Sequence, residues 1–246
     1  MTVVVIGGTG VYQWPGLTDS HSQKWETPFG PPSSPIVTGR WRGSPMAFLA
    51  RHGENHEFLP HQVNYRANIH ACSQLKPTAV VAINSVGSMS DDLPPGSLGL
   101  PDQLIDYTWG RAHTFAGEIP LETLYADMTA PYSPSVRQQL IDADSAGRLA
   151  RSQQCVYGAV QGPRLETAAE VRRLTQDGCH VVGMTGMPEA GLAAELGLPF
   201  VCVTLTANWA AGYAGTQHIE LEEIMAHIER AQVNLRALLS AWLENA

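Results

Sequence analysis

The chain repeats one pattern that few folds can accommodate: a short apolar segment followed directly by small or polar residues. Val3–Ile6 leads into Gly7–Gly10, and Phe200–Leu205 leads into Thr206–Asn208. Apolar runs of this length that are rich in β-branched residues favour buried strands. Helical patterns lie between the strands, which predicts an α/β fold: a single domain with a central mixed β-sheet flanked by helices.

The polar clusters are expected to meet at one face of that sheet, because ligands bind at the carboxyl ends of strands in open α/β sheets. The predicted clusters are Gly7–Gly10, Arg51–His52, Asn84–Ser88, Met184–Thr185 and Thr206–Asn208. Helices are predicted over 64–75, 135–151, 167–176, 190–196 and 220–244. Residues 107–134 are predicted to form a long loop, and long loops in compact domains are usually functional.

Bulk composition narrows the class of protein. The formal net charge of −8 argues against a nucleic-acid partner, because phosphate backbones demand a basic surface. No apolar run reaches the length of a membrane span, so no membrane partner is expected. The four cysteines form no CxxC pair and the N-terminus has no basic leader, so we expect a cytoplasmic protein with free thiols.

Two clusters suit a small anion. Arg51 follows an apolar strand, its fork-shaped guanidinium suits oxyanions, and His52 could add a donor; a solvated polar loop is the alternative. The backbone N–H groups of Gly7–Gly10 and the Thr9 hydroxyl could cradle an anion, although a tight turn would also explain the glycines. Gln13 stands where a dinucleotide fingerprint needs its third glycine, so dinucleotide binding is disfavoured.

Two further residues suit a heterocyclic base. Asn208 follows a buried strand, and its amide can donate and accept hydrogen bonds at once; the alternative is an Asn that begins a turn. Glu166 stands just before a predicted helix, where a negative charge is favourable, but it could equally point into a site.

Several longer motifs make the chain resemble one known family. They are IGGTG at 6–10, TPFG at 27–30, RHG at 51–53, VNYRANI at 63–69, GPRLET at 162–167, VVGMTGMPE at 181–189 and TAN at 206–208. Together they are similar to the motifs of the trimeric purine nucleoside phosphorylases and methylthioadenosine phosphorylases, over nearly the whole chain. The resemblance implies that residues 1–246 form a single nucleoside phosphorylase domain.

The resemblance also implies the reaction, which is reversible phosphorolysis of a nucleoside. Phosphate would be a co-substrate, and no cofactor or metal would be needed. The residues implied to hold phosphate are Thr9, Arg51, His52, Ser85 and Thr185. Met184 would pack against the ribose. The partners would be the nucleoside and phosphate alone, in a homotrimer to whose sugar pocket the loop Tyr107–Tyr132 is a candidate donor.

Departures from the methylthioadenosine branch indicate the substrate. That branch carries Asp at the position of Asn208 and Ser or Thr at the position of Glu166, whereas inosine phosphorylases carry this Asn and Glu. Asn208 and Glu166 are therefore implied to bind the base and to act in catalysis. Leu221 stands where inosine phosphorylases carry a His that meets the 5′-hydroxyl, and an apolar residue suits a methylthio group. His218 keeps an ordinary inosine substrate open.

The residues implied for the base and for the 5′ position of the sugar together imply cleavage of 5′-methylthioinosine to hypoxanthine and 5-methylthioribose 1-phosphate. The alternatives are a methylthioadenosine phosphorylase that tolerates Asn208 and a general inosine or guanosine phosphorylase. From other classes, a nucleoside-binding protein without catalysis and a hydrolase that uses water are also weighed.

Overall fold

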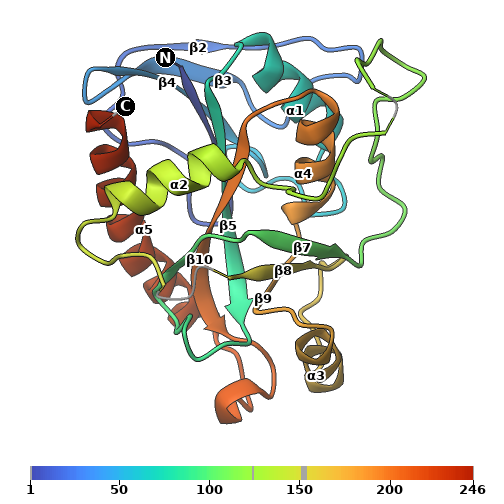
Figure 1. The fold of residues 1–246 in the computed structure, drawn as a ribbon, viewed down its shortest axis with the longest axis vertical. Helices are drawn as coiled ribbons and strands as arrows, with labels where there is room; N and C mark the ends of the chain where they lie inside the picture. Colours follow the sequence, from blue (N-terminus) through green and yellow to red (C-terminus); the bar gives the residue numbers. More distant parts are fainter. Residues whose placement is uncertain (1, 124, 151–153, 246) are drawn as a thin grey trace.

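A ten-stranded β-sheet forms the centre of the molecule (Figure 1). The computed structural model describes residues 2–123, 125–150 and 154–245. The strands follow the spatial order β2-β3-β4-β1-β5-β9-β8-β7, and β10 pairs with β5 and β6. Their bounds are β1 Val3–Gly7, β2 Thr18–Gln23, β3 Ile36–Trp41, β4 Ser44–Ala50, β5 Ala79–Ser88, β6 Leu98–Gly99, β7 Gln103–Asp106, β8 Val156–Ala159, β9 Val181–Gly183 and β10 Phe200–Trp209.

The sheet is mixed, and β5 is its pivot. β5 pairs in parallel with both β1 and β10, but its last residues, Gly87 and Ser88, pair antiparallel with Val182 and Val181 of β9. The same strand therefore joins two parts of the sheet, and its carboxyl end lies beside β9 and β10. This arrangement brings the ends of β1, β4, β5, β9 and β10 to one region.

Helices cover both faces of the sheet, because alternate strand residues point to opposite sides. Val3 and Val5 belong to the apolar cluster packed by α2 and α5, whereas Val4 and Ile6 belong to the cluster packed by α1 and α4. In Figure 1, α2 and α5 accordingly lie on one side of the sheet and α1 and α4 on the other. The helices are α1 Tyr65–Gln74, α2 Pro134–Ala143, α3 Ala168–Gln176, α4 Gly186–Glu195 and α5 Leu221–Glu244. The predicted fold class is confirmed.

Local caps explain why two helices begin where the sequence predicts. The Asn64 side chain accepts a hydrogen bond from the Ala67 N–H at the start of α1. Thr167 and Glu170 form a reciprocal capping box at the start of α3. Such caps satisfy N–H groups that have no partner inside the helix, so their position fixes the first turn.

Other boundaries differ from prediction. The helix predicted over 135–151 ends at Ala143, because the Asp144 carboxylate binds the N–H groups of Arg148 and Leu149 and holds the next segment in a turn. Residue 151 itself lies outside the described residues. The helix predicted from 190 already begins at Gly186. Strand β2 was not predicted, since every one of its residues is exposed and its sequence is polar. Within the described residues, no helix is long and apolar enough to cross a membrane.

Candidate active site

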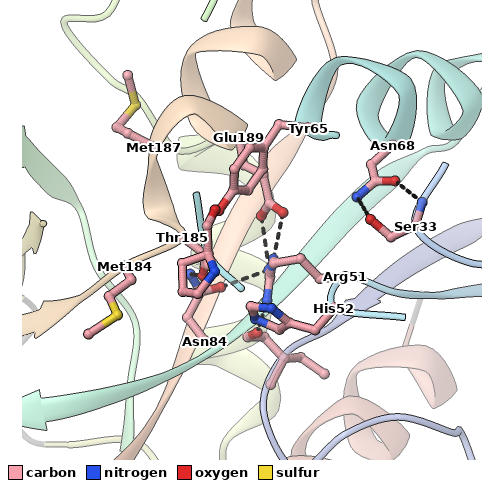
Figure 2. A network of polar contacts seen from close by, with 12 residues as sticks. Ser33, Arg51, His52, Tyr65, Asn68, Asn84, Met184, Thr185, Met187 and Glu189 are labelled. Atoms are coloured by element: carbon pink, nitrogen blue, oxygen red, sulfur yellow. Dashed lines mark hydrogen bonds and ion pairs between the residues drawn. The ribbon is translucent and has the colours of Figure 1, made fainter. Parts of the chain in front are cut away.

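Arg51 is the buried centre of a polar network at the carboxyl ends of the strands (Figure 2). It directly follows β4, and none of its surface is exposed. Its Nε and Nη2 donate to the two carboxylate oxygens of Glu189, at 2.5 and 2.9 Å, and its Nη1 donates to the Ile83 carbonyl oxygen at 2.8 Å. Burial opposes the charged form, but the Glu189 carboxylate outweighs it, so the pKa of Arg51 is raised. Arg51 therefore stays ionised, while Glu189 neutralises its charge.

Asn84 links this ion pair to Thr185. The Asn84 Oδ1 accepts from Arg51 Nη2 at 3.1 Å, and its Nδ2 donates to Thr185 Oγ1 at 2.9 Å. A hydroxyl has one hydrogen to donate, and here the Thr185 oxygen already accepts. Thr185 stands just before α4 without capping it. Among the residues that the structure describes, its O–H hydrogen has no acceptor and can donate to a group placed at the strand ends.

The glycine loop after β1 lies against Arg51. A Cβ on Gly8 would stand 2.4 Å from the Ile83 oxygen and 2.8 Å from Arg51 Nη1, so no larger residue fits there without a shift. The Ser85 hydroxyl donates to the Thr9 carbonyl oxygen at 3.0 Å and ties the loop to β5. The structure thus brings four of the predicted phosphate residues close together: Thr9, Arg51, Ser85 and Thr185. The buried Arg51 guanidinium and the Ser85 O–H already donate within the protein, so their predicted phosphate contacts stay predictions.

His52 is neutral in the folded protein. Its Nδ1 lies 2.8 Å from the Phe58 carbonyl oxygen, and since a carbonyl only accepts, Nδ1 carries the hydrogen. Burial, and then the charge of Arg51, lowers the pKa of His52 to about 4. Its ring stacks on His56, with centroids 4.7 Å apart, and His56 in turn binds Tyr12. At neutral pH the Nε2 atom of His52 is therefore an acceptor, where the sequence suggested a donor.

Glu166 lines a cavity of about 330 Å³ beside the start of α3. Trp109, Gly162 and Arg164 are among its other lining residues. Burial raises the pKa of the Glu166 carboxyl, which therefore takes up a proton at a higher pH than an exposed Glu. Met184 lies close by, because its sulfur would clash with any Cβ on Gly162.

Asn208 lines a different cavity of about 150 Å³. Strand β10 continues through it to Trp209, with an irregularity in its pairing between Thr206 and Asn208. The Asn208 Nδ2 donates to the Trp209 carbonyl oxygen at 2.6 Å. The structure therefore does not bring Asn208 and Glu166 into one cavity, and their joint role stays a prediction.

His218 and Leu221, the two candidates for contact with the 5′ end of the sugar, lie differently with respect to the cavity at Asn208. Its lining includes His218, Glu223 and His227, but not Leu221. Leu221 is the first residue of α5 and is 73% exposed. The role predicted for Leu221 stays a prediction, whereas His218 lines the same cavity as Asn208.

Comparison with known proteins identifies the family. The family model described as "Phosphorylase superfamily" matches residues 2–244. The chain belongs to the phosphorylase superfamily. The resemblance stated from the sequence motifs is thereby confirmed.

Members of this superfamily with different substrates are similar to the chain. A Xanthomonas campestris protein named probable S-methyl-5′-thioinosine phosphorylase is 47% identical over 97% of this chain and 96% of its own. A Moorella thermoacetica protein named probable 6-oxopurine nucleoside phosphorylase is 36% identical over 97% and 91%. The crystal structure of a methylthioadenosine phosphorylase from an antarctic soil metagenomic library has a TM-score of 0.88 and 33% identity, over 98% of this chain and 85% of its own.

Glu189, the ion-pair partner of Arg51, is the residue of this network that the sequence analysis did not single out. It lies inside α4 and none of its surface is exposed. The motif VVGMTGMPE contains it, but nothing in the spacing joins it to Arg51, which is 138 positions away. Asn84 belongs to one of the predicted polar clusters, and its bridging role emerges from the contacts. Among the described residues, no group of three or more His, Cys, Asp or Glu could hold a metal ion.

Proposed function

We propose that this protein catalyses the phosphate-dependent cleavage of S-methyl-5′-thioinosine to hypoxanthine and 5-methylthioribose 1-phosphate. The observation that carries the proposal is the buried series of hydrogen bonds from Glu189 through Arg51 and Asn84 to Thr185. Together with the glycine loop this network would build a phosphate site, which a protein that only bound nucleosides would not need. Phosphate is the second substrate, and it enters between the loop that carries Thr9 and the start of α4.

In this reaction a phosphate oxygen bonds to the anomeric carbon of the sugar as the glycosidic C–N bond breaks, and the sugar passes through an oxocarbenium-like state. The proton that the phosphate loses balances the one that the released hypoxanthine gains. No nucleophilic side chain is required, because positioning and charge stabilisation do the chemistry. The Thr185 hydroxyl donates to one phosphate oxygen, as does Thr9. At neutral pH phosphate still carries a hydroxyl, and that O–H donates to the Nε2 of His52. Arg51 holds Asn84 and Thr185 in place from behind.

The departing hypoxanthine is recognised by Asn208 and Glu166, which line different cavities in the isolated chain and have to come together around the base. The Asn208 amide donates to the six-oxo group as negative charge develops on the base, and this requires it to leave or share its contact with Trp209. Glu166 in its ionised form accepts the adjacent ring N–H, which hypoxanthine has and adenine lacks. Each mismatched buried contact costs about 1–3 kcal/mol, so two of them discriminate strongly against adenine.

A second candidate, general cleavage of inosine and guanosine, is favoured by one observation. His218 lines the cavity that contains Asn208 and could meet a 5′-hydroxyl, whereas Leu221 does not line it. The similarity to proteins named for S-methyl-5′-thioinosine supports the methylthio substrate instead.

The assembly and compartment belong to the same proposal. The protein is a homotrimer, and the loop 107–132 is its candidate contact with the neighbouring sugar pocket. Trp109 and Tyr125 in that loop are 73% and 90% exposed, and large apolar side chains so exposed suit an interface. The four cysteines are free and buried, which suits the reducing cytoplasm.

The decisive experiment measures base release from methylthioinosine, methylthioadenosine and inosine, each with and without phosphate. We expect methylthioinosine to have the highest kcat/KM and no turnover to occur without phosphate. Release of base without phosphate would identify a hydrolase instead, and equal rates on inosine would support the second candidate.

A further inference from the structure

Arg111 lies in the long loop between β7 and α2, but its guanidinium is buried against the main chain. Its Nη1 donates to the carbonyl oxygens of Met184 and Met187, at 2.7 Å each. Its Nη2 donates to the Gln161 carbonyl oxygen at 2.8 Å, and its Nε donates to the side chain of the same residue at 3.2 Å. The ring of Tyr65 lies 5.5 Å from the guanidinium carbon.

These acceptors belong to two segments that carry different parts of the proposed site. Met184 and Met187 stand on either side of Thr185, the proposed phosphate contact. Gln161 immediately precedes the turn that leads to Glu166, the proposed base contact. The planar guanidinium of Arg111 therefore fixes the distance between the segment that carries Thr185 and the segment that carries Glu166.

All the acceptors of Arg111 are neutral. Within 2–123, 125–150 and 154–245, Arg111 forms no ion pair, whereas Arg51 is neutralised by Glu189. His52 is uncharged at neutral pH. Among the described residues, Arg111 is thus a positive charge without a counter-charge whose hydrogen bonds reach the residues on either side of Thr185. Burial lets such a charge act over a longer distance.

We propose that Arg111 is a positioning residue with two effects: it holds the Thr185 and Glu166 segments in register, and it supplies the positive charge that attracts phosphate. The inference rests on the proposed phosphorolysis. The two effects are separable, because a lysine keeps the charge but lacks the planar fork that reaches both segments.

The test compares Arg111→Met and Arg111→Lys with Arg40→Met as the matched control. Arg40 also donates to a main-chain carbonyl oxygen, that of Gly43, in the exposed hairpin between β3 and β4. Two quantities are measured: kcat and KM for phosphate and for the best nucleoside, and the rise of Tm that inorganic phosphate produces.

Arg111→Met should lose about tenfold or more in kcat/KM for both substrates, together with most of the phosphate-induced rise of Tm. Arg111→Lys should keep the phosphate effect on Tm, with a KM for phosphate near that of the unmodified protein, but lose a similar factor in nucleoside kcat/KM. Arg40→Met should match the unmodified protein in every measurement.

A folded Arg111→Met variant with all constants within about twofold of the unmodified protein would overturn the inference. If Arg111→Met does not fold, Arg111→Lys decides, and unchanged nucleoside kcat/KM in that variant overturns the positioning role. Failure of the proposed function is distinguishable, because the unmodified protein would then cleave no nucleoside with phosphate. The phosphate effect on Tm would still test the charge of Arg111.

Discussion

At the scale of single residues, hydrogen-bond polarity in the site is set by residues that do not themselves touch a substrate. Asn84 takes one acceptor position of the Thr185 hydroxyl and leaves its O–H able to donate, and Phe58 makes the neutral His52 an acceptor at Nε2 by accepting from its Nδ1–H. Side-chain identity alone leaves both polarities open. The surrounding contacts choose one of them.

The identity of residue 208 should decide the base. Asn208→Asp is expected to shift preference from methylthioinosine toward methylthioadenosine, because a carboxylate accepts from an exocyclic amine and, when protonated, can give a proton to the departing adenine. The unmodified protein should favour the 6-oxopurine by roughly a hundredfold, from two mismatches at about 1–3 kcal/mol each. Steady-state kcat/KM on both nucleosides measures the ratio. Equal or better efficiency on methylthioadenosine by the unmodified protein would contradict the roles given to Asn208 and Glu166.

His52 should lower the free energy of unfolding as the pH drops below the pKa of an ordinary histidine. The pKa of His52 is about 4 in the folded protein, below the usual value of about 6.5. At a pH between these two values, His52 is protonated in the unfolded chain and unprotonated in the folded protein, which favours unfolding. At pH 5 this costs about 2 kcal/mol of unfolding free energy relative to pH 7.5. The His52→Asn variant can still donate to the Phe58 carbonyl oxygen. Between pH 7.5 and 5, its free energy of unfolding should fall by about 2 kcal/mol less than that of the unmodified protein.

Urea unfolding of both proteins at the two pH values tests the difference. The same comparison between pH 7.5 and 8.5 is the control, since neither state of His52 takes up a proton there. An identical acid-side loss in both proteins would show that His52 is not the titrating group.

At the scale of elements, the Arg51–Glu189 pair joins the end of β4 to α4. Glu189→Ala would leave a buried guanidinium without its counter-charge, and breaking such a pair typically costs about 3–5 kcal/mol. Glu118→Ala is the matched control, because its pair with Arg66 is exposed and should contribute less than about 1 kcal/mol. Equilibrium unfolding in urea measures both. Similar small losses in the two variants would mean that water or a shifted side chain compensates Arg51.

The elements also show how far sequence alone can reach. Starts of helices are local events, so Asn64 and Thr167 mark α1 and α3 correctly. Strand ends were found because apolar runs stop abruptly, as they do before Arg51. The end of α2 was missed because Asp144 acts on residues that follow it, in a turn that periodicity does not detect.

The site was predictable as a set of residue types and unpredictable as an arrangement. Arg51 and Thr185 stand at strand ends, and their convergence follows from general sheet topology. Their connection through Asn84 and the neutralising Glu189 depends on contacts between positions far apart in the chain. Glu166 and Asn208 line different cavities, which no pattern in the sequence indicates.

At the scale of the whole molecule, the exposed loop predicts assembly. We expect a mass in solution about three times the 26.6 kDa of the chain, by light scattering coupled to size exclusion. Trp109→Asp should weaken the assembly and lower activity together, because it places a charge on an apolar contact. Val233→Asp changes another exposed apolar side chain, on α5 and outside the loop, and should leave the mass unchanged. A fully active monomer would contradict the trimer.

The distance of Glu189 from Arg51 along the chain also has a consequence for biosynthesis. At about 5–20 residues per second, a ribosome releases Arg51 on the order of ten seconds before Glu189. During that interval the guanidinium lacks the acid that neutralises it, so closing the early strands β1, β4 and β5 over it is unfavourable. We therefore expect the amino-terminal half to close over Arg51 only once α4 has emerged.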